Sequence, residues 1–306
     1  MNSIKELIAA AAAAGPMDLA VASAQEASVL EAVADAYAAG IAKPILVGNP
    51  EAIAAAAAGA RGGKGVDISA FEIVPVQEMY AAAAKAVELV RTGRACALMK
   101  GIIDTAPLLK AVLNKETGIN AGHLASHVAV MEVPTYHKLL IVTDAAINIA
   151  PDLSGFVDII NSAVTVARAL GIQTPKVAML AAVEKVNADK MPCTATAALL
   201  TMMNRRGQIR NCIVDGPLAL DNAVSAESAR IKKIESDVAG DADILVVPDI
   251  EAGNILYKCL LDLAGAKGAG IVMGAAKPVV LTSRADTAET KLASIALASL
   301  TGRNAC

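Results

Sequence analysis

The turn at Ser283 and Arg284 carries the side chains best suited to chemistry in this chain. It follows an apolar run, Val279 to Leu281, which predicts a buried strand, and a helical pattern starts near Leu292. In an open α/β sheet such a turn lies at the carboxyl end of the strand, where the next helix points free backbone N–H groups at anions. Arginine offers a planar fork of donors to phosphate, and a serine hydroxyl can donate to an oxygen that gains charge. The pair therefore indicates an anion site or an oxyanion site.

A purely structural interpretation of the same turn exists. Asp286 and Glu289 match the N-cap and N3 positions of a capping box, and Ser283 fits an ordinary turn. For Asp286 the capping role is the better interpretation. For Ser283 and Arg284 both interpretations stay open on these residues alone.

Apolar runs of strand length alternate with helical patterns along the whole chain. The clearest helical stripe runs from Phe156 to Leu170 over four turns. Strands that are apolar on both faces and separated by amphipathic helices predict an α/β fold with largely parallel, open sheets and flanking helices. The runs are Leu19–Val21, Ile45–Val47, Cys96–Met99, Leu139–Val142, Val177–Leu180, Cys212–Val214, Ile244–Val247 and Ile271–Met273.

Two helix starts are visible in the sequence. Ser23 to Glu26 resembles a capping box before a helix that reaches Ala39. Asn49, Pro50 and Glu51 offer an N-cap, a proline at the first helical position and an acidic first turn.

The length of 306 residues predicts two domains, because single cores stop growing near ~250–300 residues. INIAPDLS, residues 147–154, marks one crossing, and a second near residues 272–278 returns the chain to the first domain. We expect residues 1–147 plus 274–306 to form one α/β domain and residues 148–273 another, with the active site in the cleft between them.

Composition excludes several classes of protein. The net charge is −3 and the chain has no Trp and only two Phe, so neither nucleic acid nor an anionic membrane is expected as a partner. No run reaches the ~20 strongly apolar residues of a membrane span. Five cysteines without framework spacing predict free thiols and a cytoplasmic protein.

Familiar motifs are incomplete. Residues 59–65 lack the first glycine and the Ser or Thr of a phosphate loop, and residues 268–274 miss the dinucleotide spacing by one. His123 and His127 could share a helix face, but no third ligand is evident, so a structural role is favoured over metal binding. Without an evident nucleophile, an enzyme of this kind would join two substrates directly.

Five stretches, in the right order, resemble the phosphate acetyltransferase and phosphate butyryltransferase family. They are Ala42–Pro50, Thr143–Asn148, Asp215–Ala223, then Pro248-Asp249 with Gly253-Asn254 and Tyr257-Lys258, and finally Lys277–Arg284. The butyryl branch is the closer fit, on Lys100-Gly101 with Thr105, Val112–Glu116, Ser126–Val128, Ile147–Pro151 and Leu281–Asp286.

The resemblance implies reversible transfer of a short-chain acyl group between coenzyme A and inorganic phosphate. It also implies a two-domain fold related to isocitrate and isopropylmalate dehydrogenases, a homo-oligomer, and no metal or redox cofactor. Acyl-CoA and phosphate are then the ligands, and coenzyme A is a substrate.

Site residues follow from the motifs and the resemblance together. Ser283 would donate to the reacting oxygen or the thiolate, and Arg284 would hold the phosphate. In the acetyltransferases an aspartate seven residues after the serine is thought to act as base. In this chain Thr290 occupies that position, and the adjacent Glu289 is the expected replacement. Further expected substrate contacts are Lys100, Thr105, Lys110, Ser126 and Asn148, although solvated lysines and a capping Asn148 remain structural alternatives.

Two other functions stay open, and a third is not supported. A phosphate acetyltransferase would use the same chemistry with a smaller acyl group, and a methylene separates substrates by only ~1–3 kcal/mol. A non-catalytic protein that binds acyl-CoA or phosphate would show affinity without turnover. A dehydrogenase would need a dinucleotide site and a carboxylate cluster for a metal, and neither is evident.

Overall fold

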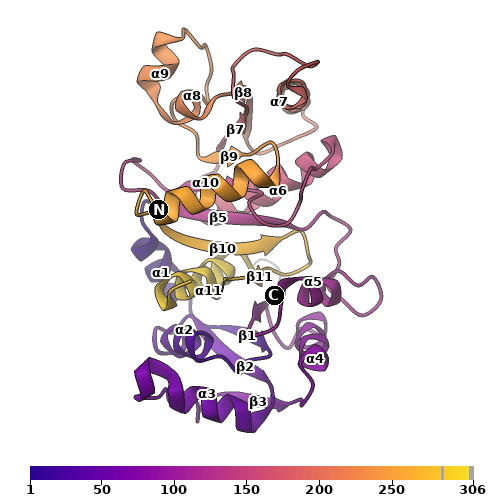
Figure 1. Ribbon diagram of the computed structural model, residues 1–306, viewed down its shortest axis with the longest axis vertical. Coiled ribbons are helices and arrows are strands. Elements are labelled where there is room, and N and C mark those ends of the chain that lie inside the picture. Colours follow the sequence, from indigo (N-terminus) through magenta and orange to yellow (C-terminus); the bar gives the residue numbers. More distant parts are fainter. Residues whose placement is uncertain (284–285, 303–306) are drawn as a thin grey trace. The chain divides into compact units, whose positions relative to one another are not determined.

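The computed structural model describes residues 1–283 and 286–302 and divides the chain into two compact units (Figure 1). The first unit combines Ile4–His123 with Ala269–Cys306. The second unit combines Leu124–Gly268 with Met1–Ser3. The first unit is thus assembled from two separate segments of the chain.

The division falls earlier along the chain than the sequence suggested. We expected crossings after residue 147 and before residue 274, whereas they lie at 123/124 and 268/269. The cause is strand pairing. Strand β5 (Ser126–Glu132) pairs antiparallel with β6 (Leu140–Thr143), and β6 pairs parallel with β9 (Ile244–Val246), so the hydrogen bonds of β5 and β6 assign both to the second unit.

The sheet of the first unit has the strand order β3-β2-β1-β4-β11-β10. All neighbouring pairs are parallel except β11 with β10, which is antiparallel. The strands are β1 (Met17–Ala22), β2 (Ala42–Gly48), β3 (Glu72–Pro75), β4 (Ala97–Lys100), β10 (Lys267–Met273) and β11 (Val279–Val280).

Helices flank this sheet in two layers. One layer is formed by α1, α11, α2 and α3, which contact one another in that order, and the other by α4 and α5 (Figure 1). The helices are α1 (Ile4–Ala13), α2 (Ala27–Ala38), α3 (Pro50–Gly63), α4 (Met79–Arg91), α5 (Thr105–Val112) and α11 (Ala288–Gly302).

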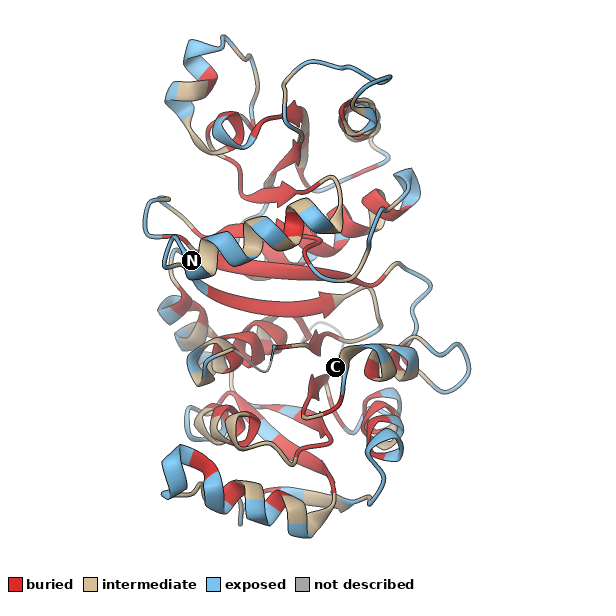
Figure 2. Ribbon diagram, viewed as in Figure 1, coloured by how far each residue is buried: buried red, intermediate tan, exposed pale blue. Residues whose placement is uncertain are grey.

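The sheet of the second unit has the order β5-β6-β9-β7-β8, parallel except for β5 with β6. Its core packs strand residues against α8 and α10, with α6 also in contact with the strands. Figure 2 shows the strands of both units almost wholly buried, whereas the helices are exposed on their outer sides. The remaining elements are β7 (Lys176–Leu180), β8 (Ile213–Leu218), α6 (Leu153–Ala169), α7 (Pro192–Arg205), α8 (Leu220–Val224), α9 (Ala226–Ile231) and α10 (Ile250–Asp262).

Every apolar run that predicted a strand overlaps an observed one, and two further strands were missed. Strand β3 is short and partly exposed, since its four residues are EIVP, so its sequence lacks an apolar run. Strand β5 has the sequence SHVAVME, in which Ser126 and His127 obscure a buried strand.

One of the two predicted helix starts is confirmed. The Asn49 side chain accepts a hydrogen bond from the Ala52 N–H at 3.0 Å, and proline follows it as predicted. The capping box at Ser23 is wrong. Ser23 has a φ of 55°, its hydroxyl donates to the Met79 carbonyl at 3.1 Å, and α2 begins only at Ala27.

The cysteines partly differ from expectation. Cys193, Cys212 and Cys259 are free, and burial raises the pKa of the Cys212 thiol to about 11, which makes it a poor nucleophile. Cys96, in contrast, is disulfide-bonded. Within the described residues, no helix has the length and apolar character required to span a membrane.

Candidate functional site

The parallel strands of the first unit bring several polar turns to one edge of its sheet. Val280 of β11 lies beside Met99 of β4 in register, so both strands end at the same edge. The Gly101 N–H donates to the Ala22 carbonyl at 2.8 Å, and a Cβ at Gly101 would lie 2.1 Å from the Ser23 carbonyl oxygen. Only glycine permits this close approach of the β1 and β4 ends.

Ser283 lies in an exposed turn that is closed from both sides at this edge. The Ser283 backbone N–H donates to the Asp286 carboxylate at 2.7 Å, and the Asp286 N–H donates to the Ser283 carbonyl at 3.1 Å. These bonds fix the backbone on which the Ser283 hydroxyl is carried. Arg284, predicted to hold phosphate, lies outside the described residues.

The capping box proposed at Asp286 and Glu289 is wrong by one residue. Helix α11 begins at Ala288, and the Thr287 hydroxyl accepts the Thr290 N–H at 3.2 Å. Thr287 is therefore the residue that caps the helix, and the Asp286 carboxylate is used by Ser283. The displacement follows from the longer turn that the structure forms before α11.

The two candidates for the base position lie in the first turn of α11. Glu289 is exposed, whereas Thr290 is half-buried with its hydroxyl 3.1 Å from that of Thr287. Lys291 is almost fully buried, and its ammonium donates to the Asp286 carbonyl at 2.5 Å. This lysine, which the sequence did not single out, ties α11 to the Ser283 turn.

Lys100 ends β4 and is 6% exposed. Its ammonium donates to the carbonyls of Gly101 at 3.1 Å and Ile103 at 3.2 Å. The buried charge therefore holds the loop that leads into α5. Beside this loop lies a hollow of about 460 Å³ lined by Glu26, Met79, Ile102 and Asp104.

Thr105 and Lys110 both lie on α5. Thr105 is the first residue of the helix and is half-buried, and Lys110 is exposed on the last part of the helix. Because Lys110 also lines a groove against α4, its ammonium is available to an anion in solution or in that groove.

Ser126 and Asn148 belong to the second unit, where one turn organises them. Asn148 donates from Nδ2 to the Ala125 carbonyl at 2.8 Å and to the Asp144 carboxylate at 2.6 Å. Ser126, next to Ala125, is fully buried, and its hydroxyl has no hydrogen-bond partner among the described residues. Asn148 does not cap α6; Asp152 does so by accepting the Gly155 N–H.

Asp144 is the residue of this turn that the sequence analysis missed. It is 3% exposed and accepts backbone N–H groups from Ala146, Ile147 and Asn148 at 2.9, 3.1 and 3.2 Å. An aspartate directly after a buried strand was the available signal, because Asp side chains bond the backbone two residues on.

Helix α10 packs closely against the Asp144 turn, also within the second unit. A Cβ at Gly253 would lie 2.6 Å from the Asp144 carbonyl oxygen, and Asn254 donates to the Ala145 carbonyl at 3.1 Å. Two motif stretches that are about a hundred residues apart in sequence are thus parts of one turn-and-helix arrangement.

His127 and His137 each contact another side chain. His127 lies on β5, not on a helix, and meets the Tyr257 ring edge-on at 5.6 Å. His137 contacts the Asp241 carboxylate at 2.9 Å. No cluster of three or more His, Cys, Asp or Glu side chains suited to a metal occurs in the described part of the chain.

A charge cluster, formed by Asp241, Asp243, Lys138, Lys176 and His137, lies at the amino ends of β6, β7 and β9. The Lys138 ammonium is 2.7 Å from Asp243 and 2.9 Å from Asp241, and the Lys176 ammonium is 2.7 Å from Asp241. Burial alone raises the pKa of Asp241, but hydrogen bonds from Lys176 and Lys138 outweigh it and hold that pKa well below its usual range.

Comparisons with known proteins find similarity to one family over nearly the whole chain. A family model described as phosphate acetyl/butaryl transferase matches residues 60–299. The phosphate butyryltransferase of Clostridium acetobutylicum is 49% identical over 304 residues, 99% of each chain. The phosphate acetyltransferase of Rhizobium meliloti is 48% identical and covers 96% of this chain and 92% of its own.

Solved structures show the same likeness in three dimensions. The crystal structure of a branched-chain phosphotransacylase from Enterococcus faecalis V583 has a TM-score of 0.81 at 35% identity, covering 94% of this chain and 99% of its own. A 4-hydroxythreonine-4-phosphate dehydrogenase from Klebsiella pneumoniae, 12% identical with a TM-score of 0.54, covers 94% of this chain and 99% of its own and shares the fold alone. The predicted fold class and the predicted family resemblance are confirmed.

Proposed function

This chain belongs to the phosphate acetyl/butaryl transferase family, and we propose that it is the acyltransferase of that family that moves a butyryl group, reversibly, between coenzyme A and inorganic phosphate. The observation that carries the proposal is the 49% identity to a phosphate butyryltransferase, which extends over 99% of both chains. The closer fit of Ser126–Val128 and Ile147–Pro151 to the butyryl branch supports the choice of acyl group.

The reaction requires no covalent enzyme intermediate. An oxygen of phosphate attacks the thioester carbonyl, an O–C bond forms and the C–S bond breaks, and coenzyme A leaves as the thiolate and takes up a proton. In the reverse direction the thiolate attacks the acyl phosphate. Negative charge develops on the carbonyl oxygen in both directions, so the enzyme must bind phosphate, stabilise this oxygen and stabilise the thiolate.

We assign the stabilising donor to Ser283 and the phosphate contact to Arg284. Ser283 is exposed at the carboxyl edge of its sheet, and Asp286 holds its backbone, which suits a fixed donor. An arginine fork and the nearby start of α11 both favour a dianion. Arg284→Ala is expected to raise the KM for phosphate about tenfold or more and to lower turnover, with the melting temperature unchanged. Unaltered phosphate kinetics would remove Arg284 from this role.

The thiolate needs little help from a base. A free thiol has a pKa near ~8.5, so part of it is ionised at neutral pH, and positive charge raises that part. We propose Lys100 and Lys110 as sources of this charge and Glu289 as an auxiliary base. Thr105, Ser126 and Asn148 are proposed as substrate contacts.

Coenzyme A is then a substrate and not a resident cofactor, and a homo-oligomer in the cytoplasm is the expected form. Light scattering on the purified protein measures its mass in solution; a mass of one chain would contradict the oligomer.

The second candidate is acetyl transfer, favoured by the 48% identity to the Rhizobium meliloti acetyltransferase. Thiol release from acyl-CoA esters of two to six carbons, with and without phosphate, separates the candidates. Phosphate-dependent release that is fastest with butyryl-CoA supports the proposal, and release that is fastest with acetyl-CoA selects the second candidate. Absence of phosphate-dependent release from every ester would contradict both and favour a binding protein.

A further inference from the structure

Lys291 carries a charge at a place in the fold where a charge is costly. It is 1% exposed, and it is the largest by volume of the described side chains that are less than 2% exposed. A lysine is almost never fully buried unless its ammonium is paired, because burial removes the water that solvates the charge. No carboxylate in the described part of the chain forms a salt bridge with Lys291.

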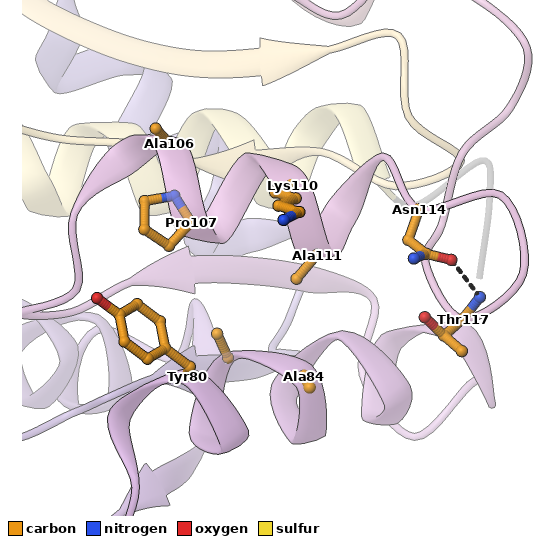
Figure 3. A pocket seen from close by; sticks show the side chains of 9 residues that line it. Tyr80, Ala84, Ala106, Pro107, Lys110, Ala111, Asn114 and Thr117 are labelled. Atoms are coloured by element: carbon orange, nitrogen blue, oxygen red, sulfur yellow. Dashed lines mark hydrogen bonds between the residues drawn. The ribbon is translucent and has the colours of Figure 1, made fainter.

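The position of Lys291 in α11 adds to this cost. It is the fourth residue of the helix, whose first backbone N–H groups already carry partial positive charge. Lys110, in contrast, lies in the last turn of α5 and is exposed along the groove between α4 and α5 (Figure 3). Both water and the helix dipole favour a cation there, and Lys291 has neither advantage.

The Lys291 ammonium reaches back past the start of α11 to Asp286. It donates to the Asp286 carbonyl oxygen, five residues earlier, at 2.5 Å. The Asp286 carboxylate in turn accepts the Ser283 N–H at 2.7 Å, and the Asp286 N–H donates to the Ser283 carbonyl at 3.1 Å. The three residues are therefore joined in one chain of hydrogen bonds that ends at the candidate site.

The Asp286 carboxylate both helps and hinders an anion at this turn. It fixes the backbone of Ser283, but it also places a negative charge 2.7 Å from the Ser283 nitrogen. Arg284, proposed to hold phosphate, is two residues away, a span of at most about 7 Å along the backbone. Like charges at such separations repel, and the partial burial of Asp286 weakens the screening by water and salt. A phosphate dianion therefore requires a positive charge that offsets Asp286.

We propose that Lys291 is a positioning residue for phosphate: its ammonium holds the Asp286 carbonyl and offsets the charge of the Asp286 carboxylate. This role rests on the proposed function, which places phosphate at Ser283 and Arg284. With the charges of Lys291 and Asp286 offset, the arginine and the start of α11 remain to attract the dianion. Lys291 acts through Asp286, so its effect belongs to phosphate binding.

The first test removes the charge of Lys291 and keeps most of its volume. Lys291→Met has an unbranched apolar side chain that suits a buried position, and it should raise the KM for phosphate about tenfold. The KM for butyryl-CoA should change by less than about twofold. Lys291→Gln keeps an N–H donor without the charge and should give a similar rise. Lys138→Met, which removes a partly buried lysine of the second unit, is the matched control and leaves the KM for phosphate unchanged.

The second test asks whether Asp286 is the group that Lys291 offsets. Asp286→Asn keeps an oxygen that can accept the Ser283 N–H and removes the negative charge. When it is combined with Lys291→Met, the KM for phosphate should return to within about threefold of the wild-type value. A lysine that served the fold alone would give the opposite result, because the double variant would be impaired at least as much as Lys291→Met.

Thermal unfolding measures phosphate binding without acyl transfer. Phosphate should raise the melting temperature of the wild type above its value in sodium chloride of equal ionic strength, because a ligand of the folded state stabilises that state. In Lys291→Met this rise should fall to about half or less. If no ester reacts with phosphate but this pattern appears, the proposed function fails and the role of Lys291 stands.

Other results exclude this role. An unchanged KM for phosphate in Lys291→Met and Lys291→Gln, with turnover intact, preserves the proposed function and removes Lys291 from phosphate binding. A raised KM in Lys291→Met alone assigns the effect to the hydrogen bond and not to the charge. If Lys291→Met does not fold, Lys291→Gln and the double variant provide the same measurements. A wild type with neither phosphate-dependent turnover nor stabilisation by phosphate contradicts both the role and the function.

Discussion

Lys110 and Lys138 carry the same charge in opposite surroundings. The Lys138 side chain is 18% exposed and its ammonium contacts the carboxylates of both Asp241 and Asp243. Lys110 is exposed along an apolar groove and makes no salt bridge within the described residues. Charges that neutralise one another stabilise the fold, whereas a cation beside an open groove is available to an anionic ligand.

The same contrast separates two sheet edges. One is the edge of the second unit that carries the charge cluster, and the other is the carboxyl edge of the first unit, which carries Ser283. In the charge cluster of the second unit, side chains are bonded chiefly to one another. At the carboxyl edge of the first unit, side chains such as Lys100 and Asp286 bond the backbone and leave Ser283 exposed. A variant of Ser283 should therefore change the rate without changing the stability, and variants in the charge cluster should do the reverse.

The largest expected effect is a decrease in the catalytic rate of the Ser283→Ala variant. Removal of one donor to the developing oxyanion should lower kcat about 100-fold or more, equivalent to about 3 kcal/mol, and leave the urea midpoint unchanged. Ser69→Ala, at another exposed serine of the first unit, is the control. A loss of stability that parallels the loss of rate would assign Ser283 to the fold.

The next largest effect is a decrease in the stability of the Lys138→Met variant. This change leaves Asp243, 5% exposed, without its lysine, which should lower the free energy of unfolding by about 2 kcal/mol. Lys85→Met breaks the exposed pair with Glu88 and should cost less than about 0.5 kcal/mol. Urea unfolding measures the free energy of unfolding of both variants. A decrease in kcat of more than about twofold for Lys138→Met would contradict the contrast, because the charge cluster would then affect the rate as well.

The charge cluster also predicts a dependence of stability on pH. The pKa of Asp241 is lower in the folded protein than the usual value near ~3.9 for aspartate. The ionised carboxylate therefore stabilises the folded protein fully above about pH 4, and this stabilisation is lost as the pH falls from there through the pKa of the folded state. Asp241 is 42% exposed, and solvent screening limits the effect to about 0.5–1 kcal/mol. Asp241→Asn should thus be less stable than wild type at pH 7 and approach it below about pH 4. A difference that is constant with pH would contradict this.

The smallest effect concerns Glu289. If this carboxylate assists thiol ionisation, Glu289→Gln should lower the rate of acyl phosphate consumption about twofold to fivefold at pH 7. The loss should shrink toward pH ~8.5, where the thiol ionises by itself. Identical pH–rate profiles would remove Glu289 from the mechanism and leave Ser283 and the positive groups to act alone.

Much of the fold was predictable because burial leaves a local signal. Apolar runs such as Ile45–Val47 and the stripe from Phe156 to Leu170 are dictated by faces that water cannot reach. The sequence did not predict strand β3, because this edge strand is partly exposed and lacks an apolar run. It did not predict β5, because the strand begins with two buried polar residues, Ser126 and His127. The pairings of β5 with β6 and of β6 with β9, which decide the unit to which β5 and β6 belong, join different parts of the sequence.

The site was predictable in residue type but not in arrangement. The sequence by itself determined that Ser283 follows a buried strand and that the motifs match one enzyme family, since both depend on residue order alone. Only the tertiary structure decided that Asp286 bonds Ser283 and not the helix, that Asp144 holds Asn148, and that alanines of α4 and α5 face one another across a groove. The groove depends on two helices that the chain brings together only when it folds. The two hydrogen bonds span only three and four residues, but which of several local partners each carboxylate takes depends on the turn that the surrounding fold imposes, and a pattern of residue types does not encode this choice.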